Sequence, residues 1–109
     1  MGTEGQLRAV AFKEGDVWVI HGIEYDLVAQ TKSLIHAPVA FLETVINTIL
    51  INQRQGRKAL ENIKPAPLKY QAMFDQAEVE LTPTGAKLRE YKIRRPDIKL
   101  RAYEPEQAA

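Results

Sequence analysis

The sequence predicts an α+β domain in which a three-stranded antiparallel sheet is covered by one long helix. Three observations lead to this fold class. The first 30 residues hold three short segments rich in β-branched and aromatic residues, separated by tight turns. Apolar residues then recur at helical spacing over residues 39–50. The chain has 109 residues, 45% hydrophobic and 27% charged, which suits one small globular domain.

The three expected strands cover residues 7–13, 16–21 and 25–30. Gly15 lies between the first two, where a two-residue turn containing glycine closes a tight hairpin. Because the links between consecutive strands are short, the segments favour an antiparallel meander.

The long helix is expected to begin between Ser33 and Ala37 and to run for about 18 residues, since Pro38 is tolerated only in its first turn. Its apolar positions recur at three- and four-residue spacings and are Val39, Leu42, Val45, Ile46, Ile49 and Leu50. Arg54 and Arg57 lie at its end, where cations suit the helix dipole, and Gly56 is a suitable cap.

The second half of the chain is less regular. Pro65 and Pro67 interrupt any helix, so a shorter helix is expected over about Leu68–Ala77. Residues 87–103 alternate charged and apolar side chains, and we expect strand positions at a sheet edge, interrupted by Pro96. Their apolar members are Leu88, Ile93, Ile98, Leu100 and Tyr103.

Two units follow from this pattern. Residues 6–81 are expected to form the core domain with its short second helix. Residues 82–109 form a basic C-terminal segment, which is either a strand added to the same sheet or one exchanged with another copy.

The composition excludes several classes of site. The chain has no cysteine, so disulfides and thiolate chemistry are impossible. No apolar run approaches the about 20 residues that span a bilayer, and the first residues lack the features of a signal peptide. We therefore expect a cytoplasmic protein with no membrane partner.

The polar residues give little support for catalysis. His21 could act as a general base, but a strand-end histidine with one hydrogen bond is the simpler interpretation, and His36 is read as a capping or loop residue. The carboxylates Asp16, Glu24, Asp26 and Glu43 lie at strand ends, in turns or alone on the helix. Without a phosphate-binding loop or a nucleophile motif, we expect no enzyme, no catalytic or metal-binding residues and no cofactor.

The basic stretches are the strongest signal for nucleic acid. Residues 52–69 carry five basic side chains against one acidic, and residues 87–101 carry seven against two. The second stretch also contains Tyr91, so phosphate contacts and base stacking are both available there. A solvated face is the alternative interpretation. The candidate nucleic-acid-binding residues are Lys87, Arg89, Lys92, Arg94, Arg95, Lys99 and Arg101.

One part of the sequence resembles a known family. The segment FKEGDVWV at residues 12–19, then EYDLVAQ at 24–30, then a long helix, resembles HicB-like antitoxins over residues 7–55. The resemblance implies a β-β-β-α unit with a further strand, a truncated ribonuclease-H-like sheet. It also implies neutralisation of a small RNA-cleaving HicA-type toxin by covering its active surface. Many members repress their own operon through a C-terminal DNA-binding domain, and no ordinary domain of that kind follows here.

The sequence therefore favours a non-catalytic, HicB-like antitoxin or interaction module that occludes a small partner protein. The expected partner-binding residues are Trp18, Tyr25, Arg54 and Arg57. We also expect homodimers, formed through an exposed sheet edge or an exchanged strand. Nucleic-acid binding through residues 87–101 is the alternative, and a hydrolase with degenerate acidic residues is the weakest hypothesis.

Overall fold

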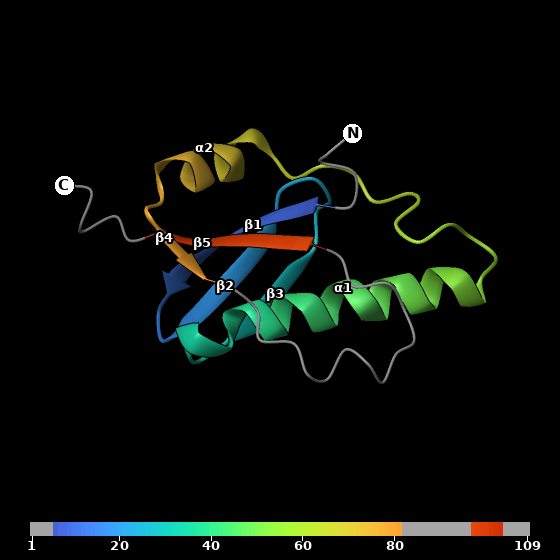
Figure 1. The fold of residues 1–109 in the computed structure, drawn as a ribbon, viewed down its shortest axis with the longest axis horizontal. Coiled ribbons are helices and arrows are strands. Elements are labelled where there is room, and N and C mark those ends of the chain that lie inside the picture. The colour runs from blue at the N-terminus through green and yellow to red at the C-terminus, as the bar shows by residue number, and fades with distance from the viewer. Residues whose placement is uncertain (1–5, 82–96, 104–109) are drawn as a thin grey trace.

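The computed structural model describes residues 6–81 and 97–103 and confirms the mixed α+β class (Figure 1). An open five-stranded sheet has the order β3-β2-β1-β5-β4. A long helix packs on one face and a short helix on the other. The elements are β1 (Gln6–Glu14), β2 (Val17–Gly22), β3 (Val28–Thr31), a one-turn 3-10 helix (Leu34–His36), α1 (Ala37–Arg54), α2 (Leu68–Gln76), β4 (Val79–Leu81) and β5 (Asp97–Tyr103).

The first three strands form the expected antiparallel meander. Glu14 pairs with Val17, so the hairpin loop has two residues, and Gly15 adopts a φ of 63° that suits the twist of the flanking strands. The third strand begins later than its sequence predicts. The Asp26 N–H donates to the Lys64 carbonyl oxygen at 2.6 Å, so this part of the chain turns toward the loop before α2 instead of joining the sheet.

The C-terminal strand lies inside the sheet. β5 runs parallel to β1, with Leu7 opposite Ile98 and Ala9 opposite Leu100, and its other side pairs with β4. The expectation of an edge strand is therefore wrong for residues 97–103, which pair with β1 on one side and with β4 on the other. β4 was not predicted, because three residues give too short a pattern. Leu88 and Ile93 lie outside the described residues.

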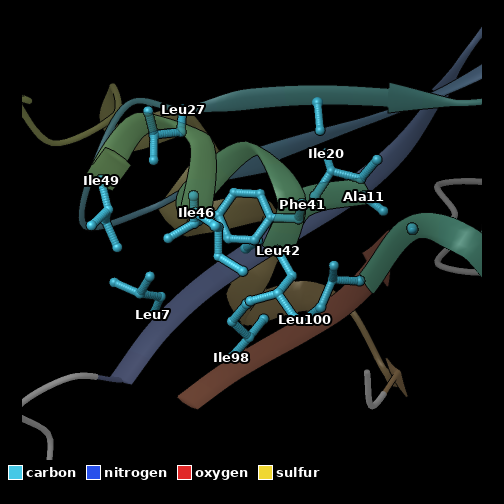
Figure 2. Packing of buried hydrophobic residues seen from close by; sticks show 14 residues of the cluster. Leu7, Ala11, Ile20, Leu27, Phe41, Leu42, Ile46, Ile49, Ile98 and Leu100 are labelled. Atoms are coloured by element: carbon cyan, nitrogen blue, oxygen red, sulfur yellow. The ribbon is translucent and has the colours of Figure 1, made fainter. Parts of the chain in front are cut away.

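The core is divided by the sheet into two layers. Figure 2 shows the larger layer, where apolar side chains of α1 meet those of β1, β2 and β5. The smaller layer lies under α2 and is built from Val10, Ile23 and Phe74. Because side chains alternate along a strand, β1 contributes to both layers and is buried on both faces.

Helix α1 has the expected start and length, but its buried face is rotated relative to the prediction. Phe41 is buried, whereas Val39 and Leu50 are only partly so. The reason lies in the opposite strand: a Cβ at Gly22 would stand 3.0 Å from the Phe41 ring and 2.6 Å from the Tyr25 carbonyl oxygen. The missing side chain at Gly22 leaves room for the ring, which brings residue 41 onto the sheet.

The end of α1 is a Schellman cap. Gly56 has a φ of 78°, its N–H donates to the Gln53 carbonyl oxygen at 3.1 Å, and the Arg57 N–H donates to the Asn52 carbonyl oxygen at 2.8 Å. The expected capping role of Gly56 is confirmed. The cap fixes the direction in which the chain leaves the helix.

The position of β5 gives a stability prediction. Leu100 is fully buried in the layer under α1, so Leu100→Ala should lower the free energy of unfolding by about 2–5 kcal/mol in urea denaturation. The control is the same substitution at Leu68, which is 84% exposed and should change stability by less than about 0.5 kcal/mol. Equal effects of the two substitutions would mean that β5 does not pack on the sheet in solution.

Candidate functional site

The free edge of β3 is the first candidate surface. Among the described residues, β3 pairs only with β2. The Gly22 N–H donates to the Leu27 carbonyl oxygen at 2.8 Å, and hydrogen-bonded pairs alternate along an antiparallel ladder. It follows that the backbone groups of Ala29 and Thr31 face β2, and those of Val28 and Gln30 face outward. Val28 is also 47% exposed.

Apart from its short length of four residues, this edge lacks the usual protection against strand pairing. Natural edge strands are shortened, charged, bulged or interrupted by proline. Residues 28–31 read VAQT and contain neither a charge nor a proline. The other edge, β4, has three residues and carries Glu80 in its middle. Of the two edges, β3 is therefore the better acceptor for an added strand.

The structure divides the four predicted partner-binding residues into two pairs. Trp18 lies opposite Thr31, at the end of β3, and is half-buried with the Lys13 ammonium 6.0 Å from its ring centroid. Tyr25 lies three residues before β3 and is also half-buried. The two aromatic residues thus flank the β3 edge. The two arginines lie elsewhere, because α1 carries Arg54 away from the point where β3 ends.

The arginines belong to a second surface, which we name the cationic loop. Its five basic residues are all exposed and are Arg54, Arg57, Lys58, Lys64 and Lys69. The loop connects α1 to α2 along one side of the molecule (Figure 1). Sequence reasoning counted the charge of residues 52–69 but assigned a role only to the two arginines.

Asn52 holds the start of the cationic loop. Its side chain is only 6% exposed, and its amide nitrogen donates to the carbonyl oxygen of Ala59 at 2.8 Å and to that of Glu61 at 3.5 Å. This role was not predicted, although Asn52 follows Ile49 at the three-residue spacing of the apolar stripe, which could have indicated it. The Asn52 amide thus supplies hydrogen bonds that these carbonyl oxygens would otherwise need from water.

His21 has no free ring nitrogen. Its Nδ1 lies 3.3 Å from the Gly22 carbonyl oxygen and its Nε2 lies 3.2 Å from Asp26 Oδ1, while the Tyr70 ring stacks on it at a centroid distance of 3.7 Å. The ring therefore joins β2 to α2 and to the turn before β3. His36 occupies the N-cap position of α1 but makes no side-chain capping hydrogen bond.

A second polar cluster fastens α2 to the sheet. Arg8 bonds to the Glu24 carboxylate through its backbone N–H and its Nε, and its Nη2 donates to Gln71 Oε1 at 2.9 Å. The guanidinium of Arg8 lies 5.5 Å from the Phe74 ring centroid, and that of Arg101 lies 4.4 Å from it. Phe74 is thus held by two cations and anchors α2.

The predicted nucleic-acid-binding residues are only partly described. Lys99 Nζ and Arg101 Nε lie 3.5 and 3.3 Å from Glu80 Oε2, and Arg101 also donates to the Phe74 carbonyl oxygen at 3.1 Å. These two residues therefore support the β4–β5 pair and α2. The other five, Lys87, Arg89, Lys92, Arg94 and Arg95, lie outside the described residues.

The acidic residues do not gather into a metal site in the described part of the chain. No group of three His, Asp or Glu side chains there is arranged to hold a metal ion. Glu24 is paired with Arg8 and Asp26 with His21. Within residues 6–81 and 97–103, these carboxylates serve the packing of α2.

The segment Leu34–Arg54 is long and apolar enough to cross a membrane, with a mean hydropathy of 1.7. This finding corrects the expectation that no segment approaches that length. The core helix of a globular fold satisfies the same criterion, and the buried residues of α1 pack against the sheet. The span is therefore weak evidence for a membrane, and a cytoplasmic location stays a prediction.

Comparisons with known proteins give no match: none was found among family models, curated proteins or solved structures. The resemblance of residues 7–55 to HicB-like antitoxins therefore stays a prediction. The geometry of this chain's own residues carries the proposals below.

The anchoring of the cationic loop can be tested with two asparagines of the same helix. Asn52→Ala leaves the Ala59 carbonyl oxygen without its partner, which should cost about 1–3 kcal/mol of stability and open the loop. Limited trypsin digestion should then cut after Arg57 and Lys58 about tenfold faster. Asn47→Ala, at an exposed position, is the control and should leave the cutting rate unchanged. Equal rates for the two variants would contradict the anchoring role.

Proposed function

We propose that this chain is a non-catalytic, HicB-like interaction module that binds a small partner protein at the free edge of β3. The observation that carries the proposal is the uncharged strand Val28–Thr31, which pairs only with β2 among the described residues. A partner strand can pair with the outward backbone groups of Val28 and Gln30, and side-chain contacts then give specificity.

The two half-buried aromatic residues support the same surface. Trp18 and Tyr25 stand near the two ends of β3, where a partner lying along the strand would contact both. Aromatic residues supply much of the binding energy of protein interfaces when a partner completes their burial. This keeps Trp18 and Tyr25 as partner-binding residues and leaves Arg54 and Arg57 outside the β3 contact.

The topology supports the HicB-like part of the proposal. The resemblance implies a three-stranded meander, a long helix and a further strand, and the observed sheet has a meander followed by α1 and a later strand beside β1. Because one fold serves many functions, the topology alone does not identify an antitoxin. In the proposed mechanism the partner is a small toxin of the HicA type, and docking on β3 covers its active surface.

We propose in addition that two copies pair through β3 when the partner is missing. An open edge with unpaired N–H and C=O groups is a template for a second strand of any source. The dimer and the partner complex then share one surface, so they exclude each other. Binding of the partner would convert a homodimer into a one-to-one complex.

Gln30 allows a test of the β3 edge with matched variants. Gln30→Pro removes an outward N–H without breaking a bond to β2, and Ala29 before it already has the extended backbone that proline requires. Gln30→Ala keeps the N–H and is the control. We expect Gln30→Pro to weaken the homodimer about tenfold in light scattering, through the lost hydrogen bond and the clash of the ring.

The same two variants serve as baits for the partner. A small protein captured from native lysate by the unchanged chain and by Gln30→Ala should be missing from Gln30→Pro. Circular dichroism checks that both variants are folded. Equal capture by the two variants would refute docking at β3. Docking would also be refuted if the unchanged chain is a monomer at high concentration and captures no protein.

A further inference from the structure

We propose that the cationic loop between α1 and α2 is a binding surface for the phosphate backbone of nucleic acid. Its residues differ from those of β3 and from the basic residues 87–95 of the sequence. Its five members, Arg54, Arg57, Lys58, Lys64 and Lys69, are exposed and come from a stretch of chain with only one acidic residue, Glu61. Such a concentration of positive charge attracts polyanions.

The charge of the loop is not neutralised inside the described part of the protein. None of its five cations forms an ion pair there, where the four salt bridges involve Arg8, His21, Lys99 and Arg101. Three acidic residues, in the loop or in the turn bonded to it, have partners of their own. Glu24 binds Arg8, Asp26 binds His21, and the Glu61 carboxylate accepts the backbone N–H of Lys58 at 2.9 Å.

The loop is also fixed before any ligand arrives. Its first residues are held by the Schellman cap and by Asn52. Its far end is tied to the turn after β2 by two backbone bonds, Asp26 N–H to Lys64 O at 2.6 Å and Ala66 N–H to Ile23 O at 3.0 Å. A ligand that binds here orders little additional backbone, which lowers the entropic cost of binding.

The arrangement suits a linear polyanion better than a single anion. The cations are distributed along a loop that leaves the end of α1 and reaches the first turn of α2, so they follow a path instead of surrounding one point (Figure 1). Phosphates repeat along a nucleic-acid strand, and lysine and arginine bind them without reading the sequence. The expected ligand is therefore RNA or DNA, bound without sequence specificity.

The salt dependence of binding gives a quantitative expectation. Five phosphate contacts to a single strand correspond to a loss of affinity of about hundredfold when salt rises from about 50 to about 200 mM. Fluorescence anisotropy with a labelled single-stranded RNA oligonucleotide measures this slope on the full chain. Affinity independent of salt would overturn the proposal.

Two double variants that have the same net charge as each other locate the site. Arg57→Gln with Lys64→Gln removes two charges from the loop, and Lys13→Gln with Lys32→Gln removes two exposed charges from elsewhere. The loop variant should bind RNA about fivefold or more weakly at low salt, and its salt slope should fall by about 1.4. The control variant should keep the affinity and slope of the unchanged chain. Equal losses, or no loss in the loop variant, would overturn the proposal and assign RNA binding to net charge or to residues 87–95.

Two further experiments distinguish nucleic acid from an acidic protein as the ligand, and the loop from β3 as the site. If the loop binds an acidic protein instead, poly-glutamate should displace the labelled RNA as effectively as unlabelled RNA does. That result would overturn the assignment of nucleic acid as the ligand. Gln30→Pro should leave the RNA affinity unchanged, because β3 is not part of the loop. Failure of partner docking and failure of RNA binding are therefore distinguishable.

Discussion

The fold depends on the burial of β1 on both of its faces. Leu7, Ala9 and Ala11 face α1, and Val10 faces α2, so one strand joins the two layers of the core. The strand also has neighbours on both sides, β2 antiparallel and β5 parallel. Small residues at positions 9 and 11 let α1 approach the sheet closely, which gives room for Phe41 above Gly22. Both candidate surfaces are positioned by elements that pack on this strand or next to it.

The parts of the fold that follow from local patterns could be predicted. The meander, the start and length of α1, the Gly56 cap and the second helix all have signals within a few neighbouring residues. The pairing of β5 with β1 has none, since it joins opposite ends of the chain in a parallel arrangement. The alternation of charged and apolar residues at 97–103 looks the same for an exposed edge as for an inner strand. Here Arg101 pairs with Glu80 and lies over the Phe74 ring, which no local pattern reveals.

The candidate site was predicted in part for the same reason. Sequence reasoning identified Trp18, Tyr25, Arg54 and Arg57 separately, but it could not show that the loop following Arg57 is bonded to the turn beside Tyr25, through Asp26 N–H and the Lys64 carbonyl oxygen. His21 and Glu24 could not be assigned from the sequence, because their partners Tyr70 and Arg8 come from other elements. The structure shows that several polar residues on the α2 side, among them Arg8, His21 and Arg101, hold this helix in place. The two surfaces proposed for binding in the described part of the chain are an edge of backbone groups and a loop of cations, which differ in the chemistry that they recognise.

The position of β5 also has a consequence for the order of events during synthesis. Residues 6–54 contain the meander and α1, and they leave the ribosome long before residues 97–103. Until the last strand is made, β1 has one unpaired side, and the layer under α1 lacks Ile98 and Leu100. Pairing between distant segments is slow because a long loop must close first. During this interval the nascent chain exposes a second open edge, at the centre of the future sheet, where strands of other chains compete with β5.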